Sequence, residues 1–271
     1  MKKILLILSI LILAVSIIGC TASPEQNMDT EIDVGVAFYP MKDILDLIED
    51  DLEEECYTLN INEFTVYQAP NNLLDNEELD ENMIQHDYFI QAFNEANDAD
   101  LVTIQPIYHA TFALYSVDYQ SLDEIPDGAS ITLPDDSTNL SRALYLLGQA
   151  GLLTFEDGKT VGLTVDDIES NPKNLQLDDQ VTLTSLAQRY TETGLAIMYP
   201  TYAISLELVD DEQRLYVEEQ DDVTENYAIS LVGREDNKDS EKIQVLLDHI
   251  TSDKVRQFLI DEYSWASSPA F

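Results

Sequence analysis

The sequence predicts an α/β protein built of two lobes, each with a mostly parallel sheet and helices on both faces. From Glu31 onward, short apolar runs alternate with segments of helical spacing, which is the pattern of parallel sheets with crossover helices. Setting aside the first 19 of 271 residues leaves 252, enough for one large domain or two lobes. No repeat or low-complexity block interrupts this pattern. Two lobes joined by crossing segments account for the length, and a ligand would then bind between them, beside the carboxyl ends of the strands.

The N-terminus has the pattern of a bacterial lipoprotein signal. Lys2 and Lys3 precede residues 4–18, which carry no charge and fall short of the roughly 20 apolar residues of a membrane-spanning helix. The run ends Ile17-Ile18-Gly19-Cys20, which resembles a lipobox. We therefore expect a signal peptide at residues 1–19, lipidation of Cys20 and a polar tether at residues 20–30. The alternative is an ordinary signal peptide or anchor helix that contains a cysteine. The lipid would hold the protein at the cell membrane, facing the extracytoplasmic side.

The first half of the chain predicts strands and helices in alternation. Residues 32–38 and 59–66 are typical of strands, and residues 41–55 place apolar side chains at helical spacing. Residues 79–94 are expected to be mostly helix. Residues 101–116 are rich in β-branched and aromatic side chains and predict two short strands. Residues 121–128 are a turn-rich connection.

The second half continues the alternation. Residues 131–133 and 195–198 predict buried strands, and residues 226–232 predict another. Ser137, Thr138 and Asn139 are capping types before a helix at residues 140–149, and Gly151 lies just past its end. Pro200 is expected to start a helix, because proline suits the first turn. Helices are also expected at residues 240–250 and 253–262.

The charge of the chain excludes one class of partner. Thirteen basic and 53 acidic residues give −40, and losing Lys2 and Lys3 with the signal lowers the net charge to −42. Nucleic acid is excluded as a partner, because its binding depends on cationic contacts to phosphate. The acidic runs predict solvated surfaces, since none has the alternating acidic spacing and central glycine of a calcium loop. An extracellular protein of a saline or alkaline habitat would carry such a surface.

Signatures of catalysis are missing from the sequence. It contains no Gly-x-Ser-x-Gly, P-loop, dinucleotide glycine fingerprint or His-Glu-x-x-His. His86, His109 and His249 lie far apart, without the spacing of metal ligands. We therefore predict no enzyme, no catalytic residue, no metal and no cofactor.

Short motifs in a fixed order carry a family resemblance. They are Glu63-Phe64-Thr65 with Tyr67 and Pro70-Asn71, Gln85-His86 with Phe93-Asn94, Leu114-Tyr115-Ser116 with residues 121–129, Thr138-Asn139 with Arg142-Ala143-Leu144, residues 171–175, and Pro269-Ala270-Phe271. Through them, residues 31–271 resemble the NlpA family, the methionine-binding lipoproteins of ABC importers. The resemblance implies a two-lobed periplasmic-binding-protein fold of the second type, with the ligand cleft between the lobes. It implies a first lobe from residues 31–116 and 225–271 and a second lobe from residues 117–224.

The resemblance also implies a function. A family member captures a free amino acid, chiefly methionine, and delivers it to a membrane permease driven by a separate ATPase, without catalysis. We expect such a protein to be a monomer. Two alternatives remain open from the sequence: a surface lipoprotein that kept the fold and acts as an adhesin or sensor, and a binding protein for a different small carboxylate or a short peptide.

Several site residues follow from the same resemblance. Arg142 lies in the first turn of a helix, where its guanidinium would form a two-pronged bond to an α-carboxylate; the alternative is a surface arginine that relieves acidic repulsion. Tyr67 and His86 would line the side-chain pocket from the first lobe, although a structural histidine is the alternative for His86. Phe89 lies near a family tyrosine position, and Ile84 replaces a family phenylalanine.

The sequence departs from the family in the second half of the site. The family's Asn-Gly-Asn appears as Tyr199-Pro200-Thr201, and its Tyr-Ala-Asn appears as Tyr227-Ala228-Ile229. The missing asparagines would bind the polar groups of an amino acid, and buried polar groups left unpaired cost about 1–3 kcal/mol each. Tyr199 and Thr201 can offer hydroxyls instead. The sequence therefore leaves open methionine or a close relative, another amino acid, a short peptide and another small carboxylate.

Overall fold

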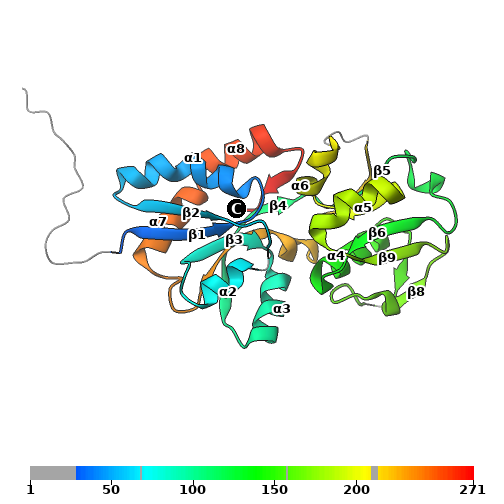
Figure 1. The fold of residues 1–271 in the computed structure, drawn as a ribbon, viewed down its shortest axis with the longest axis horizontal. Coiled ribbons are helices and arrows are strands. Elements are labelled where there is room, and N and C mark those ends of the chain that lie inside the picture. The colour runs from blue at the N-terminus through cyan, green and yellow to red at the C-terminus, as the bar shows by residue number, and fades with distance from the viewer. Residues whose placement is uncertain (1–28, 68, 157, 209–212) are drawn as a thin grey trace, which may run out of the picture.

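The computed structural model describes residues 29–67, 69–156, 158–208 and 213–271, which fold into two α/β lobes lying side by side (Figure 1). The predicted signal peptide and Cys20 lie outside the described residues, as does most of the tether. Within the described part of the chain, no helix is both long and apolar enough to cross a bilayer.

The first lobe is a six-stranded sheet with helices on both faces. Its order is β13-β4-β12-β3-β1-β2, and β1 pairs in parallel with both β2 and β3. The strands are β1 (Glu31–Val36), β2 (Thr58–Glu63), β3 (Glu81–Gln85), β4 (Leu101–Ala110), β12 (Ile229–Arg234) and β13 (Ser267–Pro269). Helices α1 (Met41–Glu54), α7 (Glu241–Ile250) and α8 (Asp253–Tyr263) lie over one face, and α2 (Ala69–Asp75) and α3 (Asp87–Asn97) over the other (Figure 1).

The second lobe is a five-stranded sheet of order β11-β5-β10-β6-β9. Its strands are β5 (Ala113–Ser116), β6 (Ser130–Pro134), β9 (Gln176–Val181), β10 (Leu195–Met198) and β11 (Arg214–Val217). Helices α4 (Ser137–Gln149), α5 (Leu186–Thr193) and α6 (Pro200–Ala203) belong to this lobe, and β7 (Thr154–Phe155) pairs with β8 (Ile168–Ser170). The chain crosses between the two sheets after β4 and again between β11 and β12.

The structures of α1 and α4 explain the sequence patterns from which these helices were predicted. In α1, Ile44, Leu45, Ile48 and Leu52 recur at helical spacing and are fully buried against the first sheet. In α4, the cap is Asp136, whose carboxylate accepts the Asn139 backbone N–H at 3.0 Å. The helix therefore starts at Ser137, three residues before the predicted start.

The prediction of mostly helix at residues 79–94 is wrong for its first half. Residues 81–85 form β3, and the helix begins only at Asp87. β3 lies between β1 and β12, and all five of its residues are buried. A strand covered on both faces shows no alternation of polar and apolar residues, so its period cannot be told from that of a buried helix.

Other elements differ at their ends or were not predicted. The strand predicted at residues 59–66 ends at Glu63, and the one predicted at residues 226–232 begins at Ile229, after a short 3₁₀-helix. Helices α2 and α5 and strands β7, β8, β9, β11 and β13 were not among the predicted elements. β5, within the segment expected in the first lobe, is hydrogen-bonded into the second sheet.

Candidate functional site

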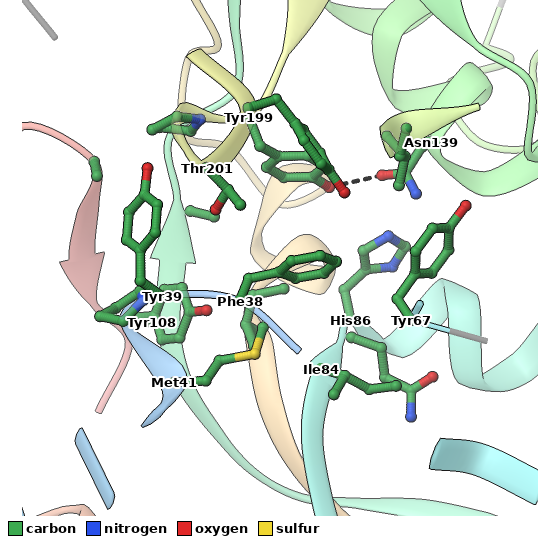
Figure 2. A pocket seen from close by; sticks show the side chains of 18 of the residues that line it. Phe38, Tyr39, Met41, Tyr67, Ile84, His86, Tyr108, Asn139, Tyr199 and Thr201 are labelled. Atoms are coloured by element: carbon green, nitrogen blue, oxygen red, sulfur yellow. Dashed lines mark hydrogen bonds between the residues drawn. The ribbon is translucent and has the colours of Figure 1, made fainter. Parts of the chain in front are cut away.

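A cavity lies between the two lobes, at the carboxyl ends of β1 and β3. The empty space of the cavity, counted out to the open solvent at its mouth, is about 600 Å³. Phe38 from the first lobe packs against Tyr202 from the second, with ring centroids 5.8 Å apart, so the lobes are in contact around it. Figure 2 shows side chains from both lobes pointing toward this space. Its lining is Phe38, Tyr39, Pro40, Met41, Tyr67, Ile84, Gln85, His86, Phe89, Tyr108, Ala110, Asn139, Leu183, Tyr199, Pro200, Thr201, Tyr202, Ile229 and Ala266.

The cavity wall is aromatic and uncharged. Phe38, Tyr67 and Phe89 form a continuous run, with centroid distances of 6.3 and 5.6 Å between successive rings. None of the described lining residues is an aspartate, glutamate, lysine or arginine. Such a wall suits a solute with an apolar part and a few uncharged hydrogen-bonding groups.

His86 is the most specific polar group of the wall. His86 is the N-cap residue of α3, and its Nδ1 accepts a hydrogen bond from the Phe89 backbone N–H at 3.2 Å. Burial, together with the nearby Arg142 charge, lowers the pKa of His86 to about 3, so the ring is neutral and its proton lies on Nε2. Nε2 has no hydrogen-bond partner of normal geometry, although the Asn139 amide lies beside it. His86 therefore presents one N–H donor at the cavity (Figure 2).

Tyrosine hydroxyls supply the remaining polar groups. The Tyr199 hydroxyl donates to Asn139 Oδ1 at 2.7 Å (Figure 2), and burial raises the pKa of Tyr199 to about 12, so it is protonated. The Tyr202 hydroxyl is buried without a hydrogen-bond partner in the described structure. Buried hydroxyls are normally hydrogen-bonded, so this group is available to a ligand.

Arg142 lies behind the cavity and does not line it. Its side chain is fully buried, and Nε and Nη2 donate to the two carboxylate oxygens of Glu218 at 2.8 and 2.5 Å. Nη1 donates to the Tyr199 hydroxyl at 2.9 Å, and Nη2 also donates to the Ala110 carbonyl at 3.2 Å. Burial opposes the charge, but Glu218 and Tyr199 raise the pKa of Arg142, so it stays positive. Glu218 cancels this charge locally.

Amide side chains fix the position of β3 and hence of His86. Asn71 of α2 donates to Gln85 Oε1 at 2.6 Å, and Asn82 donates to Asn71 Oδ1 at 2.8 Å. Gln85 in turn donates to Asn82 Oδ1 at 3.0 Å. The three amides are buried and satisfy one another, so they hold α2 against the strand that ends at His86.

The structure brings most predicted site residues together. Seven line the cavity, namely Tyr67, Ile84, His86, Phe89, Tyr199, Thr201 and Ile229. Tyr227 and Arg142 are fully buried outside the lining, and the Tyr227 ring packs 4.8 Å from both the His86 ring and the Arg142 guanidinium. The exposed alternative considered for Arg142 is wrong, and the structure places its guanidinium on Glu218.

Sequence reasoning missed the connection between β1 and α1. Phe38, Tyr39 and Pro40 line the cavity from this connection, Met41 lines it from the first position of α1, and Tyr202 lines it from α6. One signal was present: these four residues follow the first parallel strand, and ligands of open α/β sheets bind at such carboxyl ends. Within the described residues, no group of His, Cys, Asp and Glu side chains is arranged to hold a metal ion.

Comparisons with known proteins place the chain among solute-binding lipoproteins. A family model described as NlpA lipoprotein matches residues 32–271. The methionine-binding lipoprotein MetQ of Bacillus subtilis is 32% identical over 99% of both chains, and the membrane lipoprotein TpN32 of Treponema pallidum is 30% identical over 93% of this chain and 91% of the relative.

Solved structures agree with the sequence relatives. A methionine-binding lipoprotein of Bacillus subtilis superposes with a TM-score of 0.82 at 32% identity, covering 89% of this chain and 98% of the other. A nutrient-binding protein of Burkholderia cenocepacia, solved bound to methionine, gives a TM-score of 0.81 at 25% identity, covering 89% and 100%. The predicted two-lobed periplasmic-binding-protein fold is confirmed.

Proposed function

The chain belongs to the NlpA lipoprotein family, and from this premise we propose that it is an extracytoplasmic solute-binding lipoprotein of an ABC importer. It captures methionine or a related small amino-acid-like solute between its lobes and delivers it to a membrane permease coupled to an ATPase. Solute binding, not catalysis, is the activity of this family, in agreement with the prediction that the chain is not an enzyme.

One observation carries the proposal: an aromatic cavity between two lobes that holds an unpartnered, neutral histidine donor. Phe38, Tyr67 and Phe89 supply an apolar surface for a methionine-like side chain. His86 Nε2–H and the Tyr202 hydroxyl supply uncharged hydrogen-bonding groups without protein partners. A ligand that satisfies these groups gains hydrogen bonds that the empty protein leaves unmade.

The anchor and the partner belong to the same proposal. Lipidation of Cys20 would keep the monomeric domain at the outer face of the cell membrane, within reach of the permease. The acidic surface would keep the domain soluble there, because like charges repel one another.

A thermal-shift screen of the lipoprotein purified in detergent tests the proposal. We expect methionine-like solutes to raise the melting temperature, since a ligand at 100 times its Kd adds about 2.7 kcal/mol of stability. His86→Gln should weaken this shift, because it removes the aromatic ring and its N–H donor from the wall. His109→Gln is the matched control, since His109 does not line the cavity. Uptake of the same radiolabelled solute should fall in cells that lack the protein.

Two results would contradict the proposal. The first is a well-folded protein that no amino acid, amino-acid derivative or short peptide stabilises. The second is binding without any effect of the protein on uptake, which would favour a sensor or adhesin.

A further inference from the structure

The positive charge nearest the cavity is already neutralised. Arg142 and Glu218 form a two-pronged pair, and their side chains are 0% and 1% exposed. Four of the five guanidinium N–H groups are accounted for by Glu218, Ala110 and Tyr199. A carboxylate in the cavity would therefore meet no free cation at this point.

Tyr199 stands between Arg142 and the cavity. Its ring lines the cavity, while its hydroxyl accepts from Arg142 Nη1 at 2.9 Å and donates to Asn139 Oδ1 at 2.7 Å. The amide nitrogen of Asn139 is itself bonded to both oxygens of Asp136 at 3.0 Å. The phenol thus fills the position from which a ligand carboxylate would reach the guanidinium.

The other residues that line the cavity provide no positive charge for a ligand carboxylate. His86 is neutral, and the other polar lining groups are hydroxyls and amides. The whole chain carries −40, so its field also opposes an anion. An ionised carboxylate placed in such a site loses its hydration without gaining a counter-charge.

We infer that the cavity takes amino-acid-like solutes whose carboxyl group is not free, such as an amino-acid amide or a peptide-linked residue, and that Tyr199 sets this specificity. The inference rests on the proposed function and narrows its substrate class. An amide carbonyl accepts a hydrogen bond from His86 Nε2–H without bringing a negative charge, and the side chain packs on the Phe38, Tyr67 and Phe89 rings.

Titration calorimetry of the full lipoprotein in detergent tests this with three probes: L-methionine, L-methioninamide and N-acetyl-L-methioninamide. We expect at least one amide to bind at least about tenfold tighter than methionine, because a buried charge without a partner is costly. Tyr199→Asn shortens the side chain and exposes Arg142, so the preference should shift toward methionine by about tenfold or more. Tyr145→Phe is the control, since this tyrosine of α4 bonds to Asp221 outside the cavity, and it should keep the wild-type preference.

The outcomes separate the two proposals. Wild-type protein that binds methionine as tightly as both amides would overturn the inference and leave the proposed function standing. Protein that binds none of the three probes would overturn the inference, and the proposed function falls with it only if the wider thermal-shift screen also finds no stabilising solute. If Tyr199→Asn fails to fold, the affinities of the wild-type protein for the three probes still test the inference.

Discussion

Arg142 and Glu218 form a buried two-pronged ion pair that joins helix α4 to the segment through which the chain returns from β11 to the first lobe. The two residues lie 76 positions apart in the sequence. Arg142 also donates to the carbonyl of Ala110, at the end of β4, where the chain first leaves that lobe. One side chain therefore ties together both crossings between the lobes.

This position predicts a structural role for Arg142. Arg142→Ala should lower the free energy of unfolding by about 3–5 kcal/mol, because it leaves Glu218 buried without its partner. Urea unfolding measures the loss, and Arg142→Met combined with Glu218→Leu should recover part of it. Arg189→Ala, which removes an exposed ion pair with Asp178, is the control and should change little. A loss for Arg142→Ala as small as that of the control would contradict the account.

The neutral state of His86 predicts an acid-sensitive fold. The folded-state pKa of about 3 lies below the unfolded value of about 6.5, so the unfolded chain binds more protons between these values. The contribution of His86 to stability is therefore present above pH 6.5 and is lost as the pH falls toward 3. Between pH 7 and pH 5 the loss is about 2 kcal/mol.

His86→Gln removes this titration and should flatten the pH dependence of unfolding between pH 7 and pH 5. His249→Gln, at the end of α7 and outside the cavity, is the matched control and is measured over the same pH range. The slope is measured by urea unfolding at several pH values. An unchanged slope in His86→Gln would show that this histidine is not held neutral.

The buried Glu81 predicts a pH dependence of stability that is opposite in sign to that of His86. Burial raises the pKa of this carboxyl well above its ordinary value, the Asp80 charge adds to the rise, and Lys242 opposes it. Neither carboxyl oxygen has a hydrogen-bond partner in the described structure. Because the folded pKa lies above the unfolded one, the contribution of Glu81 is present below about pH 4.5 and is lost as the pH rises through the folded value.

Glu81→Gln should therefore stabilise the protein, and its gain in stability over the wild type should grow as the pH rises from about 4.5. Glu53→Gln, on the exposed side of α1, is the control. Parallel melting curves across pH measure the difference. If the stability gain of Glu81→Gln shrinks with rising pH, the raised pKa of Glu81 is contradicted.

The lipobox pattern predicts the location of the protein. Cys20→Ala should either leave the precursor uncleaved or release the protein into the medium, because the acyl attachment site is gone. Cell fractionation and metabolic labelling with palmitate measure this. A cleaved Cys20→Ala protein that remains in the membrane fraction would contradict lipidation.

The sequence predicted elements whose apolar residues form a clear pattern. Helix α1 was predicted from the helical spacing of its buried residues, and strand β10 from a short run of four apolar residues. Strand β3 was missed because three of its five buried residues, Glu81, Asn82 and Gln85, are polar, and α2 because it has only seven residues and begins Ala69-Pro70. Local patterns therefore say little about elements whose buried residues are polar or that are very short.

The site was predicted unevenly for a related reason. Motif positions such as His86 and Tyr199 line the cavity, and the fold that positions them is shared with the family. The role expected for Arg142 depended on which partner meets it, and Glu218 belongs to a distant part of the chain that no local pattern connects to α4. Tertiary pairing of this kind follows from the fold rather than from spacing.

The most direct test of solute capture between the lobes is a ligand titration of two variants. One variant has a tryptophan in the cavity, and the other has a tryptophan in a surface hollow elsewhere. Thr201→Trp places a large ring in the cavity, and Gln188→Trp does the same in a surface hollow on α5. The best probe of the thermal-shift screen is titrated into both variants after their folding is checked by circular dichroism. The account predicts that Thr201→Trp loses at least about tenfold in affinity while Gln188→Trp binds like the wild type. Equal affinity in all three proteins would contradict it.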